Sequence, residues 1–332
     1  MVEATDADRS LRCMSTLTDA TDPARPTRVG FFGPVGTFTQ QALRTLDHLR
    51  DAEHIPYRTV PDVLDAVESG QVEFGFVPIE NSIEGMVNFT QDALAFDHHL
   101  LIQCEVVLDI EHCLLTVPGT SLDDINQVRS IQVATAQCHR YLRDRLPNAE
   151  VVAANSTADA ARSIAETGDP TIAALAPRMA AEVYGLEVAV ADIADHPGNQ
   201  TRFVLVAREV VPAPTGHDTT ALVIYQRADE PGSLISILQE FAARRINLSN
   251  LFSRPTKKAG LGNYCFIVYA DGHVSDELLA DSMRSLHAKQ GGVKFLGSYP
   301  RSGEGSDEAR AETDTRWQGA DRWLADIRAS II

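Results

Sequence analysis

The chain has 332 residues, 44% of them hydrophobic, and a formal net charge of -17 at pH 7. This length is typical of two domains, and the acidic balance argues against nucleic acid as a partner, because phosphate binding requires a basic surface. No apolar run reaches the roughly 20 residues that cross a bilayer. Residues 1–27 lack the apolar core of a secretory signal, so we expect a mobile polar arm on a cytoplasmic protein without membrane attachment.

The cysteines predict neither a disulfide framework nor a zinc site. Their number is odd, and no pair has the CxxC spacing of a metal-binding or redox motif. Reduced thiols are the ordinary state in the cytoplasm. We therefore expect no metal and no structural disulfide among the five: Cys13, Cys104, Cys113, Cys138 and Cys265.

Apolar strands alternate with amphipathic helices from residue 28 to residue 208, which predicts an α/β domain with a largely parallel sheet. Glycine and proline punctuate the pattern at several of its turns. Strands are expected at 28–33, 55–60, 74–80, 100–117, 130–136, 149–155, 171–177 and 202–209, with helices at 36–49, 61–70 and 178–186 and after the strands at 130–136 and 149–155.

A second domain is expected at 219–301, after a linker at 209–218 that is rich in proline, glycine and threonine. Its elements follow the order βαββαβ, which is the ferredoxin-like arrangement. In the remaining tail, 302–332, apolar residues fall at roughly helical spacing and predict a short amphipathic helix: Trp317, Trp323, Leu324, Ile327 and Ile331.

Polar residues follow two of the predicted strands of the first domain. The stretch GPVGTFT at 33–39 opens a helix, whose free N–H groups suit an anion. From the pattern alone, an ordinary capped turn is the favoured explanation. Glu80, Asn81 and Ser82 end a later strand, and ligands of open α/β sheets bind at carboxyl ends of strands. A turn with an Asn or Ser cap is the alternative there.

A third polar stretch, NQTRF at 199–203, lies just before the last strand of the domain. Thr201 could donate a hydrogen bond to a leaving oxygen, and Arg202 could hold a carboxylate. Read alone, the stretch is better explained by a surface ion pair of Arg202 and a turn capped by Thr201. The sequence contains no GxSxG, P-loop, HExxH or GxGxxG motif.

Taken together and in this order, these stretches resemble the prephenate dehydratase family. The family motifs Gly-Pro-x-Gly-Thr-Phe, Pro-x-Glu-Asn-Ser and Asn-x-Thr-Arg-Phe correspond to residues 33–38, 78–82 and 199–203. The second motif runs on to Gly85 and Asp92. The second domain resembles the ACT regulatory domain, through Pro-Gly-x-Leu at 231–234 and the residues from Asn247 to Pro255.

The resemblance implies a two-lobed catalytic domain like a type 2 periplasmic binding protein. Lobe one would comprise 28–105 and 190–208, and lobe two 106–189. It also implies the decarboxylating dehydration of prephenate to phenylpyruvate without a cofactor, feedback control by phenylalanine or another amino acid, and a homodimer or homotetramer. Arogenate dehydratase and a non-catalytic amino-acid sensor are the alternative functions.

Residue roles follow from the same resemblance. Catalysis would involve Thr201, Asn81, Ser82 and Glu80. Substrate would be bound by Thr37, Phe38, Thr39, Asn199, Arg202, Phe203 and Gln137. The allosteric effector would be bound by Pro231, Gly232, Ser233, Leu234, Asn247, Leu248, Ser253, Arg254 and Pro255.

The sequence departs from the family pattern at two places. The middle lobe often carries Ser-His-Pro, but here Ile131 and Gln132 follow Ser130, which argues against that histidine as an indispensable base. In the regulatory domain Phe252 replaces the glutamate that usually precedes Ser-Arg-Pro, so the identity of the effector stays open.

Overall fold

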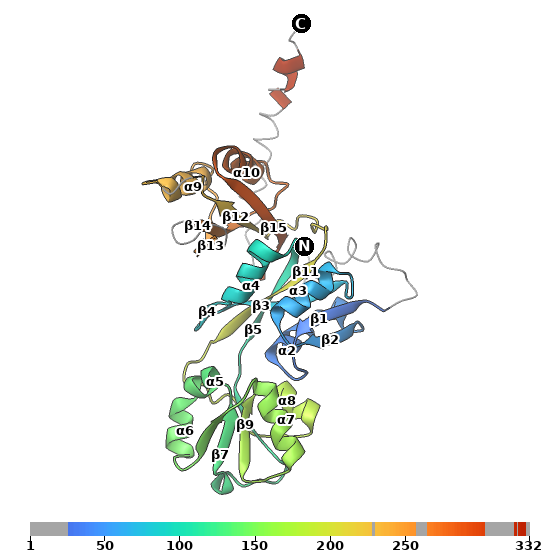
Figure 1. Ribbon diagram of the computed structural model, residues 1–332, viewed down its shortest axis with the longest axis vertical. Helices are drawn as coiled ribbons and strands as arrows, with labels where there is room; N and C mark the ends of the chain where they lie inside the picture. The colour runs from blue at the N-terminus through green and yellow to red at the C-terminus, as the bar shows by residue number, and fades with distance from the viewer. Residues whose placement is uncertain (1–25, 228–229, 257–263, 303–321, 324, 330–332) are drawn as a thin grey trace, which may run out of the picture. The chain divides into compact units, whose positions relative to one another are not determined.

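A computed structural model describes residues 26–302, with gaps at 228–229 and 257–263, together with 322–323 and 325–329. Two compact units contain these residues (Figure 1). The first combines Pro23–Gln91 with Val106–Leu205, and the second combines Asp92–Glu105 with Val206–Ile332. The second unit therefore includes a segment from the middle of the predicted catalytic domain.

The predicted terminal segments lie largely outside the described residues. This is true of the arm up to residue 25 and of Trp317, Leu324 and Ile331 in the tail. Residues 322–323 and 325–329 are helical, and the side chains of Trp323 and Ile327 are exposed.

One sheet of the first unit is built on the strand β3, whose sequence FGFVPIEN is almost continuously buried, as expected for a central strand covered on both faces. β1 pairs in parallel with β2 and with β3, and the strand order is β2-β1-β3-β11-β5, with β4 hydrogen-bonded to β3. The bounds are β1 Arg28–Phe32, β2 Glu53–Tyr57, β3 Phe74–Asn81, β4 Gly85–Met86, β5 Leu101–Asp109 and β11 Gln200–Ala207.

Two helices of the first unit, α2 (Phe38–Leu43) and α3 (Val60–Glu68), contact β1 and β3. Thr59 and Asp62 form a reciprocal capping box that starts α3, with a proline in its first turn. A 3-10 turn at Asp47–Leu49 and the helix α4 (Asn88–Asp92) complete this part of the chain, and α4 continues into a π-helical segment, η3 (Ala93–Asp97).

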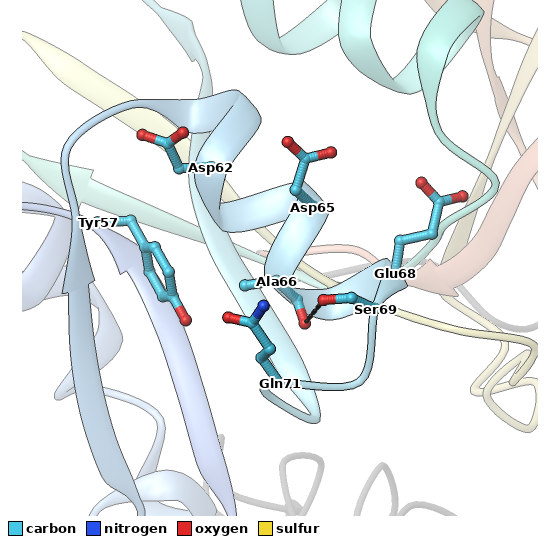
Figure 2. A pocket seen from close by; sticks show the side chains of 7 residues that line it. All are labelled: Tyr57, Asp62, Asp65, Ala66, Glu68, Ser69 and Gln71. Carbon is cyan, nitrogen blue, oxygen red and sulfur yellow. Dashed lines mark hydrogen bonds between the residues drawn. The ribbon is translucent and has the colours of Figure 1, made fainter.

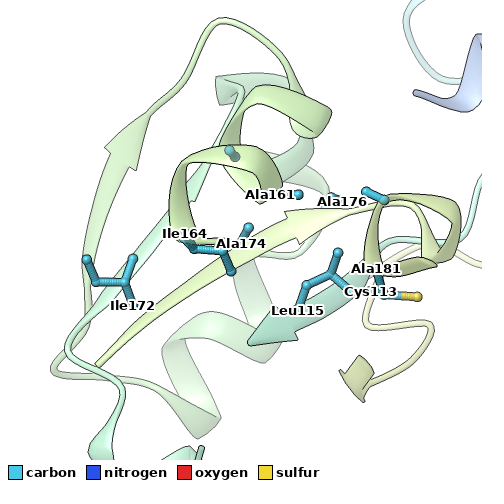
Figure 3. Close-up of a cluster of buried hydrophobic side chains, with 10 residues drawn as sticks. Cys113, Leu115, Ala161, Ile164, Ile172, Ala174, Ala176 and Ala181 are labelled. Carbon is cyan, nitrogen blue, oxygen red and sulfur yellow. The ribbon is translucent and has the colours of Figure 1, made fainter. Parts of the chain in front are cut away.

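The second sheet of the first unit has helices on both faces. Alternate residues of its strands enter two separate cores, one beneath α7 and α8 (Figure 3) and one beneath α5 and α6. Its strands, in the order β10-β6-β9-β7-β8, are β6 Cys113–Thr116, β7 Gln127–Ser130, β8 Glu150–Ala153, β9 Ile172–Ala176 and β10 Glu187–Val190. Its helices are α5 Gln132–Gln137, α6 His139–Arg145, α7 Thr157–Thr167 and α8 Arg178–Tyr184, with a 3-10 turn at Leu122–Asp124.

Three expectations for this region need correction. The stretch 130–136 is not a strand, because β7 ends at Ser130 and α5 begins at Gln132. Its β-branched residues favoured a strand, but tertiary packing overrides so short a propensity signal. The extended stretch 100–117 is two strands, interrupted after Asp109. Moreover, β6 pairs antiparallel with β9 and β10, so the second sheet is mixed.

The second unit contains the ferredoxin-like module that the element order predicts. Its antiparallel sheet has the order β13-β14-β12-β15, and α9 and α10 bury Ile237, Phe241, Leu279 and Leu286 against it. The bounds are β12 Asp218–Tyr225, α9 Ser233–Ala242, β13 Leu248–Pro255, β14 Tyr264–Asp271, α10 Glu277–Lys289 and β15 Gly292–Pro300. Throughout the described part of the chain, no helix has the length and apolarity needed to traverse a bilayer.

Phe76 of β3 and Phe203 of β11 stack at a ring-centroid distance of 5.6 Å and are almost fully buried. Replacing Phe76 with alanine should lower the free energy of unfolding by about 3–5 kcal/mol, because it removes buried area and leaves a cavity. Denaturant unfolding measures the change. Phe89→Ala is the control, since the Phe89 side chain is 52% exposed and its loss should cost within about 0.5 kcal/mol. Equal losses in the two variants would contradict this account of the core.

Candidate active site

Asn81 lies at the end of β3, where its side chain is held in one orientation. Its Oδ1 accepts hydrogen bonds from the backbone N–H groups of Ile83 and Glu84, both at 2.9 Å. This arrangement directs Nδ2 toward β11, where it donates to Thr201 Oγ1 and Asn199 Oδ1, each at 2.9 Å. The two backbone donors thus assign the amide oxygen and nitrogen without ambiguity.

Thr201 is the acceptor in its bond with Asn81, which decides what its hydroxyl proton can do. Because Nδ2 of Asn81 has only hydrogens to offer, Thr201 Oγ1 must accept there. The O–H of Thr201 is then left to donate to a further group. The residue is 9% exposed, so such a donor acts in a largely desolvated environment, where hydrogen bonds are stronger.

Ser82 fixes the register between the two strand ends. Its backbone N–H donates to Gln200 O at 2.8 Å, and its hydroxyl accepts from Gln200 N at 2.9 Å. The same hydroxyl donates to Asn199 Oδ1 at 3.3 Å. Two stretches far apart in sequence are therefore joined by backbone and side-chain bonds, and the predicted partners Asn81, Ser82, Asn199 and Thr201 do form one cluster.

Gln137, from α5, extends this cluster toward the second sheet. Its Oε1 accepts from Asn199 Nδ2 and from His112 Nε2, both at 3.0 Å. Its Nε2 donates to Glu84 Oε1 at 3.3 Å. The family resemblance predicted Gln137 but not His112 or Glu84. The side chains of both residues join the cluster through Gln137, and no spacing in the sequence indicates such a contact.

His112 is buried beside Gln137. Because Gln137 Oε1 is an acceptor, His112 must carry its proton on Nε2, which leaves Nδ1 as a buried acceptor with no hydrogen-bond partner in the described residues. Burial lowers the pKa of His112 below its ordinary value, which the hydrogen bond to Gln137 only partly offsets. The ring also makes an edge-to-face contact with Phe38 at 5.5 Å.

Arg202 and Phe203 occupy two different environments beside Thr201. Arg202 forms an ion pair with Glu80, with Nε 3.2 Å from Oε2 and both side chains about 30% exposed. Phe203 points into the core, where it stacks on Phe76. The ion pair of Arg202 corresponds to the alternative given above for this residue, in which it does not bind a carboxylate of the substrate. Phe203 packs on the buried face of β11.

The GPVGTFT turn also contacts the second sheet's helices. Gly36 has a φ of +86°, and a Cβ there would lie 3.2 Å from Tyr184 Cε2, so only glycine fits easily. The Tyr184 hydroxyl donates to Val35 O at 2.7 Å. Thr37 caps α2 by accepting from Gln40 N, and Thr39 is buried.

The ferredoxin-like module, which the resemblance predicts to be a regulatory module, has its own cavity, of about 390 Å³. Of the predicted effector residues, Gly232, Ser233, Leu234 and Ser253 line it, together with Gln226, Glu230, Ile235, Tyr264 and Phe266. Pro231, Leu248 and Pro255 are not among the lining residues. Asn247 instead donates to Asp271 Oδ2 at 3.0 Å, and Arg254 forms an ion pair with Asp92.

A larger cavity of about 660 Å³ lies beside α3 (Figure 2). It contains none of the predicted site residues. Asp62, Asp65 and Glu68 line it, so its negative charge disfavours an anionic substrate.

The described residues offer no cluster of three or more histidine, cysteine or acidic side chains that could hold a metal ion. Four of the five cysteines are described, and all four are buried and outside any disulfide. Desolvation raises the pKa of Cys138 to about 12 and that of Cys265 to about 11, so neither is a reactive thiolate. Cys13 lies outside the described residues.

The lowered pKa of His112 predicts a pH-dependent stability. The pKa of histidine in the unfolded chain is near 6.5, and that of His112 in the native state is lower. Between these two pKa values the unfolded chain therefore binds a proton that the native state does not bind. Stability should be complete above that pH and fall as the pH drops below it toward the native pKa. Thermal midpoints measured from pH 8 to pH 5 should show a shallower loss in His112→Gln, with some loss remaining because burial also lowers the pKa of His48. An unchanged slope in His112→Gln would contradict the assignment.

Comparisons with known proteins identify the family. The family model described as prephenate dehydratase matches residues 29–211. Prephenate dehydratase of Mycolicibacterium vanbaalenii is 40% identical over 290 residues, which cover 82% of this chain and 90% of that protein.

Two solved structures are similar over most of the chain. Prephenate dehydratase of Arthrobacter aurescens, in complex with L-Phe, is 39% identical, with a TM-score of 0.83 and coverage of 92% of this chain and 100% of that one. GqqA, described as a novel type of quorum quenching acylase, is 28% identical, with a TM-score of 0.75 and coverage of 83% and 98%. On the extent of the family match and of the sequence identity, this chain belongs to the prephenate dehydratase family.

Proposed function

We propose that this protein is a prephenate dehydratase, which converts prephenate to phenylpyruvate, carbon dioxide and water. The observation that carries the proposal beyond family membership is the bond from Asn81 Nδ2 to Thr201 Oγ1. It leaves the Thr201 proton available to a hydroxyl that departs from the substrate. A weak acid suffices for this step, because formation of the aromatic ring drives the departure.

The reaction consumes one proton and breaks two bonds. The bond from the ring to its carboxylate breaks, and its electron pair enters the ring as carbon dioxide leaves. The C4–O bond breaks at the opposite side of the ring, and the departing hydroxyl becomes water. Thr201 donates a hydrogen bond to this oxygen as charge develops on it, and solvent supplies the net proton.

The surrounding amides serve to hold Thr201 in place before the reaction begins. Asn81 fixes the hydroxyl from one side, and Asn199 and Gln137 continue the network. Donors that are already oriented cost no reorganisation when charge develops. Ser82 and the Arg202–Glu80 pair would hold the two strand ends, and Thr37, Phe38 and Thr39 would line the substrate's position.

Removal of the Thr201 hydroxyl should therefore reduce catalysis while the fold survives. Thr201→Val keeps the side-chain shape, and we expect phenylpyruvate formation to fall roughly 100-fold, as losses of single oriented donors do. Thr201→Ser should recover much of the activity because it restores the hydroxyl. Circular dichroism checks folding. Near wild-type turnover in folded Thr201→Val would refute the role of the hydroxyl.

We further propose feedback by phenylalanine through the cavity of the regulatory module. The start of α9, after Gly232, lines the cavity, and the N-terminus of a helix suits the carboxylate of an amino acid. Glu230 could pair with its ammonium group, and Leu234 and Phe266 would contact an apolar side chain. The complex of the Arthrobacter aurescens relative with L-Phe supports this ligand. A homodimer or homotetramer in the cytoplasm remains part of the proposal.

Phenylalanine should lower turnover and raise the thermal midpoint of the wild-type protein, because a ligand stabilises the state that it binds. Ser253→Leu should abolish both effects by filling the cavity. Ser249→Leu is the matched control, since it changes the same residue type on β13 away from the lining residues. A raised midpoint without a change in turnover would retain binding and reject inhibition, and loss of both effects in Ser249→Leu would reject the assigned position.

The similarity to GqqA makes acyl transfer the second activity to test. Such chemistry needs a nucleophile activated by a general base. Thr201 is hydrogen-bonded to an amide, which cannot act as that base. Incubating the purified protein with prephenate, arogenate and an acylated amine, and measuring each product, separates the dehydratases, the acylase and a non-catalytic sensor.

A further inference from the structure

Residues 92–105 lie within the span of the family match, yet they form one compact unit with the regulatory module. Asp92 is the last residue of α4, and η3 follows it directly. Strands of the module therefore contact a segment that the chain enters immediately after Asn81 and its hairpin.

Three strands of the module bind this segment through polar side chains. Arg254 of β13 donates from Nε to Asp92 Oδ1 at 2.7 Å and from Nη2 to Oδ2 at 2.6 Å. Lys294 of β15 donates to the carbonyl oxygens of Leu94, Ala95 and His98, at 2.8, 3.1 and 2.6 Å. Tyr225 of β12 donates to Ala95 O at 3.2 Å.

The ion pair of Arg254 and Asp92 is the strongest of these contacts. It is two-pronged and charge-assisted, and about a quarter of each side chain is exposed, so solvent screens it less than a surface pair. The hydrogen bond to Asp92 raises the pKa of Arg254. Arg254 directly follows Ser253, which lines the effector cavity, so a shift of β13 at the cavity moves the guanidinium.

Helix α4, which ends at Asp92, is also hydrogen-bonded to β3. Thr90 Oγ1 donates to Pro78 O at 2.8 Å, and Val87 N donates to Ile79 O at 3.0 Å. Gly85 pairs directly with Asn81 across the β3–β4 hairpin. These contacts connect α4, which ends at Asp92, to the hairpin that holds the Asn81 amide.

The π-helical segment η3 directly follows Asp92, and the module binds it as well. A π-helix is rare, and it occurs frequently at functional sites. Lys294 and Tyr225 bind carbonyl groups of η3. If η3 changed from π-helical to α-helical hydrogen bonding, these carbonyl groups would point in other directions.

We propose that the Asp92–Arg254 ion pair couples the effector cavity to Asn81, so that Arg254 transmits the effector's presence and does not bind the effector. This inference rests on the proposed function, because it names the route of its regulation. Effector binding beside Ser253 would shift β13, move Asp92 through Arg254, and alter the hydrogen bond from Asn81 to Thr201.

Asp92→Asn in the full-length protein tests the coupling, because it weakens the pair and keeps the side-chain shape. An allosteric effector commonly acts by roughly 5- to 150-fold. In Asp92→Asn, the factor by which phenylalanine lowers turnover should fall toward one, while phenylalanine still raises the thermal midpoint. The double variant Asp92→Arg/Arg254→Asp should recover part of the inhibition by reversing the pair.

Asp281→Asn is the matched control. Asp281 forms a partly buried ion pair with Arg244, at 2.6 Å, in the same module but away from residues 92–98. Its loss should leave inhibition as in the wild type. Inhibition of Asp92→Asn equal to that of the wild type would overturn the coupling, and so would loss of its midpoint shift, which would make the pair part of the effector site.

Hydrogen exchange gives a readout that does not depend on activity. Phenylalanine should change the exchange rates of amides 82–87 in the wild type, and this change should be absent in Asp92→Asn. Equal changes in both proteins would reject the coupling. If prephenate were not consumed by the wild type, the proposed function would fail, while the exchange data would still decide the coupling.

Discussion

The candidate site depends on one constraint: the side-chain Oδ1 of Asn81 accepts from two successive backbone N–H groups. Those donors orient the amide, and the oriented amide decides which way the Thr201 hydroxyl donates. The hydroxyl thus obtains its direction from the turn that follows β3. The turn is held in place by the exchange of hydrogen bonds between Ser82 and Gln200, so a threonine of ordinary acidity becomes a directed donor.

Sequence patterns predicted the alternation of strands and helices and the ferredoxin-like module, and the family resemblance assigned Asn81, Ser82, Asn199 and Thr201 to one site. Periodicity and turn residues are local signals, and the motifs were identified by their order. His112 and Glu84 escaped detection because they enter the cluster through Gln137, a contact that only the folded chain creates. The helix at 132–137 was missed because its β-branched residues have the propensity of a strand.

The regulatory residues show the same limit more sharply. Ser253 and Arg254 are neighbours in one motif, yet on a strand successive side chains point to opposite faces. Ser253 therefore lines the cavity while Arg254 binds Asp92. A motif records that both positions matter to the family, and the pleat of β13 assigns them to different faces.

The close packing at Gly297 of β15 bears on whether the regulatory module could be exchanged between related proteins. A side chain there would place its Cβ 2.6 Å from the backbone oxygen of Ile102. Strand β15 therefore packs against residues 92–105 so closely that no side chain fits at position 297. The module and residues 92–105 are therefore matched surfaces. A recombination event with its crossover in the linker near residue 208 would separate them, and regulatory modules exchanged between relatives in that way would carry half of an interface.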